Sequence, residues 1–152
     1  MATFALSGCV GTPGNVASLR NAFSVAKPGD TLVIPPGDYA LDGKTPIPLK
    51  SDLTVIAEGA TFRLPESMGD KARAVVFQGE NVMNLRWRGG RFTGRVFDPS
   101  RADNTWEPNV NTRGILITTT PQGRSGNLAF ERVESDGLAG AAITVLGAQK
   151  SL

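Results

Sequence analysis

The sequence predicts an all-β fold built from many short strands, and three observations carry this prediction. First, 18 glycines and 10 prolines are scattered through the 152 residues, as expected where tight turns are frequent. Second, short runs of β-branched and other apolar residues end at turn-forming residues roughly ten times along the chain. Third, one strand–turn–strand phrase recurs. The length and the 40% hydrophobic content fit a single domain, 1–152, with a sizeable core.

One helix is predicted near the N-terminus, over residues 15–26. Val16, Leu19 and Phe23 recur at helical spacing and form an apolar stripe. Asn15 is a suitable N-cap, and Thr12 with Pro13 in the first turn is the alternative. Lys27-Pro28-Gly29 ends the helix, because the residue before a proline avoids the helical region. A single apolar stripe has to pack on an apolar surface, so we expect this helix to cap the β structure.

The remaining periodic segments all resemble strands, bounded by Gly, Pro or small polar residues. They are Thr3–Leu6, Thr31–Ile34, Asp38–Leu41, Leu53–Ile56, Ala60–Leu64, Ala74–Phe77, Asn84–Arg88, Gly114–Thr118, Asn127–Val133 and Ala142–Leu146.

The recurring phrase predicts stacked coils. Its copies are Asp52–Phe62, Asn84–Phe92 and Asn127–Ser135, whose starts lie 32 and 43 residues apart. A loose period with insertions is typical of a solenoid, in which each coil contacts only its neighbours. We therefore expect coils over about residues 30–152, with a polar loop insertion over about residues 96–112.

Composition excludes several classes of site. The chain has no histidine, which excludes a Ser-His-Asp triad, a histidine base and His-ligated zinc. Cys9 is the only cysteine, so no internal disulfide or cysteine cluster can form. No apolar run approaches the ~20 residues of a membrane span. We expect neither a membrane nor a nucleic acid as partner.

The first 65 or so residues resemble the opening of the pectate-lyase-like superfamily. The resemblance rests on a helix followed by Lys27-Pro28-Gly29-Asp30, an apolar strand, Pro35-Pro36-Gly37-Asp38-Tyr39, and the segment Pro46–Val55. It implies a right-handed parallel β-helix with an N-terminal capping helix, a polysaccharide ligand, and an extracellular or periplasmic location. Members of the family are longer, so we expect this chain to be an N-terminal portion, truncated at its C-terminal side. We expect no signal peptide in the chain, because residues 1–9 lack its basic and apolar regions.

The basic cluster is the leading candidate site. Six of the eleven arginines lie between Arg86 and Arg113. Strand alternation over Asn84–Arg88 points Leu85 and Trp87 to one face and the arginines to the other. Outward guanidinium groups can hold anionic sugars by charge and by paired hydrogen bonds. The predicted substrate-binding residues are Arg86, Arg88, Arg95, Arg101 and Trp106, the last by stacking on a sugar ring. The alternative is a solvated sheet face, with Trp106 folded back on the coils.

Carboxylates supply weaker candidates. Asp98, Asp103 and Glu107 could bind Ca²⁺ through oxygen ligands, although no cofactor is required by the sequence. Glu134 and Asp136, two residues apart near a strand end, could form a glycosidase pair with Glu131 nearby. The alternative for them is a polar strand end before a turn. Catalytic residues are not assigned.

We therefore expect the N-terminal part of a β-helix protein that acts on acidic polysaccharide, as a lyase or glycoside hydrolase. The family's catalytic residues tend to lie on central coils, so we expect no turnover from this chain alone. One alternative is a non-catalytic carbohydrate-binding or adhesive β-helix, as in surface proteins and phage tailspikes. A second alternative is a purely structural piece of a solenoid. An open C-terminal end also predicts either further coils or a homo-oligomer, because it leaves strand edges unpaired.

Overall fold

The computed structural model describes residues 3–5, 14–64, 73–94, 111–138 and 140–147, which form thirteen strands and one helix. In chain order these are β1 (Thr3–Ala5), α1 (Val16–Val25), β2 (Thr31–Val33), β3 (Gly37–Ala40), β4 (Ile47–Pro48), β5 (Thr54–Ile56), β6 (Ala60–Arg63), β7 (Arg73–Glu80), β8 (Met83–Arg88), β9 (Arg91–Thr93), β10 (Asn111–Thr118), β11 (Gly126–Glu131), β12 (Glu134–Asp136) and β13 (Ile143–Leu146). The predicted all-β class is confirmed, with three parallel sheets and a single described helix.

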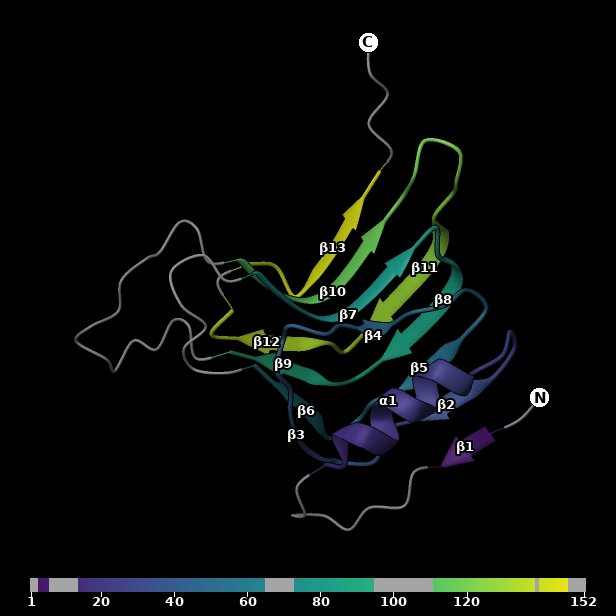
Figure 1. The fold of residues 1–152 in the computed structure, drawn as a ribbon. Coiled ribbons are helices and arrows are strands. Elements are labelled where there is room, and N and C mark those ends of the chain that lie inside the picture. The colour runs from purple at the N-terminus through teal and green to yellow at the C-terminus, as the bar shows by residue number, and fades with distance from the viewer. Residues whose placement is uncertain (1–2, 6–13, 65–72, 95–110, 139, 148–152) are drawn as a thin grey trace.

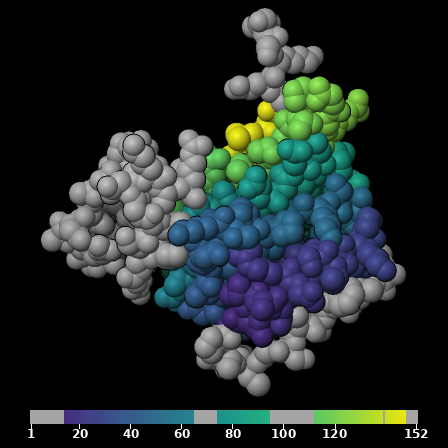
Figure 2. Space-filling model, viewed as in Figure 1, coloured from purple at the N-terminus to yellow at the C-terminus, as the bar shows by residue number. Residues whose placement is uncertain are grey.

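The chain visits the three sheets in a fixed order. Sheet A has the strand order β1-β2-β5-β8-β11, sheet B the order β3-β6-β9-β12, and sheet C the order β4-β7-β10-β13. Each round of the chain adds one parallel strand to each sheet. Strands β2 to β13 make up four such rounds, and β1 pairs with β2 in sheet A ahead of the first. Figure 1 shows the strands of each sheet lying side by side, and in Figure 2 the colour passes from purple at one end of the molecule to yellow at the other. This arrangement is consistent with a parallel β-helix-like fold.

Parallel register places side chains of successive rounds in columns between the sheets. One column runs Leu32, Val55, Trp87, Phe130 in sheet A. A second runs Tyr39, Phe62, Phe92, Ser135 in sheet B, and a third runs Ile47, Phe77, Ile115, Ile143 in sheet C. Aromatic rings from all three columns meet in the centre; Phe77 and Trp87, for example, have centroids 4.8 Å apart. The core is therefore shared by the three sheets.

The helix follows its prediction closely. Asn15 is the N-cap, and its Oδ1 accepts a hydrogen bond of 2.9 Å from the Ser18 amide. Leu19 and Phe23 are fully buried in the core. At the C-terminal end, the Lys50 ammonium donates to the carbonyl oxygens of Ser24 and Ala26, which satisfies groups that a helix end leaves unpaired. Figure 1 shows α1 at the end of the sheets where β1 and β2 lie.

The predicted strands are present, with corrections at their ends. The strands predicted at Ala74–Phe77 and Gly114–Thr118 are longer, as β7 and β10. The strand predicted at Asn127–Val133 ends earlier, at Glu131, because Arg132 has a positive φ of 52°, which turns the chain away from the extended direction. The predicted loop over about residues 96–112 gives way to β10 at Asn111, and its residues 96–110 lie outside the described part.

A ladder of amide hydrogen bonds runs along one edge of the stacked rounds. Asp52, Asn84 and Asn127 each have a φ between 50° and 59° and stand just before or at the start of a sheet A strand. Asn127 Nδ2 donates to Asn84 Oδ1 at 2.7 Å, and Asn84 Nδ2 donates to Asp52 Oδ1 at 2.7 Å. Asn and Asp are the non-glycine residues that tolerate this backbone region best. These three residues open the three copies of the recurring phrase.

The last round is less covered than the rounds beneath it. Ile117 in β10 is fully buried, whereas its register partner Val145 in β13 is 48% exposed. Leu128 and Phe130 are half-buried, although Leu85 and Trp87 below them are buried. The edges of β11, β12 and β13 carry no further strand among the described residues. None of the described helical segments is long and apolar enough to cross a membrane.

Candidate functional site

The corner that links sheet A to sheet B changes length along the stack, and this change creates a hollow. In the second round, residues 57–60 connect Ile56 to Thr61. In the third round, the register partners Arg88 and Arg91 are connected by Gly89 and Gly90 alone. The fourth round also has a two-residue corner, residues 132–133. The longer corner therefore projects past the two shorter ones above it.

The resulting hollow has a volume of about 370 Å³. That lies within the roughly 300–1,000 Å³ typical of small-ligand sites. Its walls come from three successive corners and the adjoining sheet B strands. It is lined by Glu58, Gly59, Ala60, Thr61, Gly89, Gly90, Arg91, Arg132 and Glu134.

The third-round corner forms a tight wall that only glycine fits. Gly89 has a φ of 77°, and a Cβ built on it would come within 2.9 Å of the backbone nitrogen of Glu58. A side chain there would be strained and would displace the neighbouring corner. The buried Trp87 holds the same corner from inside, because its indole Nε1 donates to the Gly89 carbonyl oxygen at 2.8 Å. The wall is thus fixed by backbone packing and by a core side chain.

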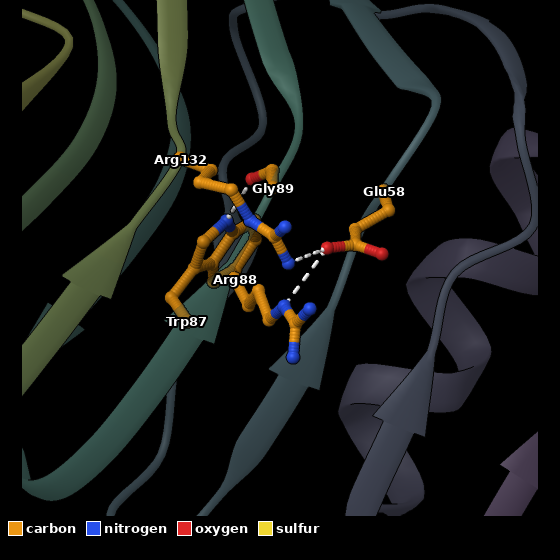
Figure 3. Close-up of polar contacts among 5 residues, drawn as sticks. All are labelled: Glu58, Trp87, Arg88, Gly89 and Arg132. Carbon is orange, nitrogen blue, oxygen red and sulfur yellow. Dashed lines mark hydrogen bonds and ion pairs between the residues drawn. The ribbon is translucent and has the colours of Figure 1, made fainter.

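Glu58 binds two arginines from the rounds above it. Arg88 Nε donates to Glu58 Oε1 at 2.8 Å, and Arg132 Nη2 donates to the same oxygen. Figure 3 shows the two guanidinium groups converging on the Glu58 carboxylate. All three side chains are about half exposed, so each pair contributes little to stability, typically about 0–1 kcal/mol. The two ion pairs instead fix the positions of the Arg88 and Arg132 guanidinium groups.

Arg132 occupies a backbone position that the round beneath gives to glycine. Arg88 pairs with Glu131, so the next residues, Gly89 and Arg132, are equivalent. Arg132 keeps a left-handed φ of 52°. A non-glycine residue in that region costs about 1–2 kcal/mol, and such strain is often found at functional sites.

Arg91 and Asp136 form a second ion pair beside the hollow, on the outer face of sheet B. Arg91 Nη2 lies 2.6 Å from Asp136 Oδ2, and Nε lies 3.3 Å from Oδ1. The hydrogen bond from Arg91 holds the pKa of Asp136 below its ordinary value of 3.8. The same hydrogen bond raises the pKa of Arg91. Both groups remain charged at neutral pH.

This pair makes a small, pH-dependent contribution that can be measured. The folded pKa of Asp136 is lowered, so its contribution is present above the unfolded value of 3.8 and is lost as the pH falls through the folded value. We expect Asp136→Asn to lower the free energy of unfolding at neutral pH by about 0.2–1 kcal/mol, and by progressively less as the pH falls below 3.8. Urea melts over a series of pH values check this. Arg91→Gln should give no additional loss in the Asp136→Asn background; independent, additive losses would contradict the pairing.

The predicted binding residues fall into two groups. The Arg86 and Arg88 side chains are exposed on the outer face of sheet A, with Leu85 and Trp87 buried behind them, so the predicted alternation is confirmed. Arg88 contacts Glu58, whereas Arg86 pairs with no described side chain. Arg95, Arg101 and Trp106 lie outside the described residues, as do Asp98, Asp103 and Glu107, the predicted Ca²⁺ ligands. Their assignments stay predictions.

The predicted carboxylate group is only partly brought together. Glu134 and Asp136 lie in the short strand β12, and both are exposed. Asp136 is engaged by Arg91, and Glu134 lines the hollow. In the part of the chain that the structure describes, no three Cys, Asp or Glu side chains are placed to hold a metal ion.

Sequence reasoning missed Glu58 and Arg132 as members of a site. They lie 74 residues apart, and nothing in either local pattern indicates the other. The one local signal was the Gly89-Gly90 pair directly after Arg88, which marks a close approach of backbones.

No family model, curated protein or solved structure matches this chain.

Proposed function

We propose that the chain is part of a right-handed parallel β-helix of the pectate-lyase-like kind, with α1 as its N-terminal cap. The motifs from Lys27 to Val55 support this proposal, together with the repeated order of the three sheets. The burial of Leu19 and Phe23 at the first rounds supports the capping role. An extracellular or periplasmic location goes with the same proposal. The exposed last round is suited to pairing with further coils or with a second copy.

The function that the geometry supports best is binding of acidic polysaccharide to the outer face of sheet A. The observation that carries this proposal is that the Arg86 side chain is exposed on β8 and forms no ion pair with a described residue. Arg88 and Arg132, by contrast, are already held by Glu58. The unpaired Arg86 guanidinium, two residues along β8 from the positioned Arg88, offers paired hydrogen bonds to a uronate carboxylate or a sulfate.

For this chain we favour binding over turnover. Glycoside hydrolysis typically requires one carboxyl group as general acid and a second as nucleophile or general base. The hydrogen bond from Arg91 lowers the pKa of Asp136, which makes Asp136 a poor general acid. Within a whole lyase or hydrolase, these arginines would neutralise substrate charge while other coils supply the base. In an adhesive β-helix the same surface would act without any reaction.

The test compares two ligands of equal shape and different charge. We expect polygalacturonate to bind about tenfold more tightly than its methyl ester, since one charge-assisted contact contributes about 1.5–3 kcal/mol. Raising the salt concentration should weaken the binding of the acidic ligand and leave the binding of the ester unchanged. Arg86→Ala with Arg88→Ala should weaken binding of the acid by about tenfold or more, while urea melts stay within about 1 kcal/mol of the parent. Affinity electrophoresis or calorimetry measures the binding.

The matched control is Lys44→Ala with Arg124→Ala, which removes two exposed charges outside β8. The control should leave affinity for polygalacturonate unchanged. Equal affinity for the acid and the ester, or an equal loss in both double variants, would rule out a specific site on β8. Ultraviolet absorbance of an unsaturated uronate product would show that the chain also turns over.

A further inference from the structure

The hollow at the A–B corner has a lining that selects for a particular ligand chemistry. Arg91 and Arg132 contribute two positive charges, and Glu58 and Glu134 contribute two negative charges. Thr61 adds a hydroxyl group, and the remaining lining residues are glycines and Ala60. An apolar ligand would find no apolar side chain larger than alanine. A phosphate or sulfate would face two carboxylates.

The balance of donors and acceptors suits a ligand with several hydroxyl groups. A guanidinium group has five N–H donors, and a carboxylate only accepts. Both Arg88 and Arg132 use Oε1 of Glu58, so Oε2 has no partner among the described residues. A hydroxyl group can donate to that oxygen and accept from a guanidinium group at the same time.

The position of Arg132 is set in advance of any ligand. Its backbone keeps a left-handed φ where the preceding round has Gly89, and its guanidinium is held by Glu58 (Figure 3). A donor that is already ordered loses less freedom when a ligand binds. The hollow also adjoins Arg88, two residues along β8 from Arg86, which is one step along the same face of the strand.

We propose that this hollow is a subsite that holds one sugar ring through its hydroxyl groups, next to the charged site at Arg86. This inference rests on the proposed function, because the ring in the hollow is a neighbour, in the same polysaccharide chain, of the residue whose anionic group Arg86 binds. The two sites then recognise different features of the polysaccharide. Arg86 binds its charged group, and the hollow binds its hydroxyl groups.

The test crosses two variants with two ligands, trigalacturonate and its methyl ester, which share their ring hydroxyls and differ in charge. Arg132→Gly removes the guanidinium at a position where glycine is conformationally favoured, so the corner keeps its shape. We expect Arg132→Gly to lower the affinity for both ligands to the same extent, by tenfold or more. Arg86→Ala should lower the affinity for trigalacturonate alone. Calorimetry gives the affinities of the parent protein and of both variants for each ligand.

A second variant guards against an indirect effect of Arg132→Gly on the corner. Glu134→Gln keeps the size of a lining side chain and removes its charge; it too should weaken both ligands. The control is Arg124→Gly, which removes an exposed arginine that does not line the hollow. It should change neither affinity.

The outcomes separate this inference from the proposed function. If both ligands bind equally to the parent protein and Arg132→Gly weakens both, the hollow is a sugar subsite and the acidic preference is wrong. If Arg86→Ala weakens the acid while Arg132→Gly and Glu134→Gln change neither affinity, the acidic site stands and the subsite is refuted. A loss in Arg132→Gly restricted to trigalacturonate would also refute the subsite, because it would mean that Arg132 reads charge.

Discussion

Replacing Phe23 with alanine should lower the free energy of unfolding by about 3–5 kcal/mol. The Phe23 side chain is fully buried, and its ring lies 5.1 Å from Phe77 and 6.4 Å from Trp87, centroid to centroid. Alanine would leave a cavity between α1 and two sheets that rigid strands cannot close. Urea melts followed by circular dichroism measure the loss.

The same helix supplies the control for this prediction. Val25 is 49% exposed, so Val25→Ala should cost less than about 0.5 kcal/mol. Phe23→Leu, which keeps most of the apolar volume, should fall between the two variants. A loss below about 1 kcal/mol for Phe23→Ala would mean that α1 is peripheral to the core and does not cap it.

Trp87→Ala should have an effect of similar size, again about 3–5 kcal/mol. Trp87 is among the largest fully buried side chains, and it contacts the rings of Phe23, Phe62, Phe77 and Phe92. The substitution also leaves the Gly89 carbonyl oxygen without its indole donor. Loss of a buried hydrogen-bond partner accounts for about 1–3 kcal/mol of such a cost, so we expect the loss for Trp87→Ala to lie toward the upper end of the range of about 3–5 kcal/mol.

Trp87→Phe keeps an aromatic ring in the core. It removes the hydrogen bond to Gly89 and the second ring of the indole, so its cost should be at least about 1–3 kcal/mol. Because Gly89 forms a wall of the corner hollow, binding of the methyl-esterified sugar should weaken in this folded variant as well. Unchanged stability in Trp87→Phe would show that the indole hydrogen bond contributes nothing to the corner.

The parts of the fold that follow from local periodicity could be predicted from the sequence. The helix is set by Asn15 and the stripe to Phe23, and the alternation of Leu85 and Trp87 with Arg86 and Arg88 gives the two faces of β8. These patterns depend on neighbours within a few residues. Register between rounds does not, since it depends on pairing partners such as Val55 and Trp87.

The candidate site depends on that register, and this explains why only half of it was predicted. Arg86 and Arg88 could be placed on an outer face from strand alternation alone. The contact between Glu58 and Arg132 requires the two-residue corners of the upper rounds to be stacked on the longer corner below. The sequence shows the lengths of these corners only once the strand ends are known. The positive φ of Arg132 is likewise invisible in the residue type, because arginine seldom adopts it.

The ladder of Asp52, Asn84 and Asn127 has a consequence for how this architecture can change. The segments that lead into it differ in length, with residues 81–82 in one round and 119–125 in the next. Despite this, Asn84 and Asn127 meet in the same place and the strands after them stay in register. The side-chain hydrogen bonds of this ladder therefore keep successive sheet A strands in register after connecting segments of different length. Peptides inserted into residues 119–125 should leave the register of sheet A unchanged. New surface features can therefore arise in this segment without disturbing the face that carries Arg86.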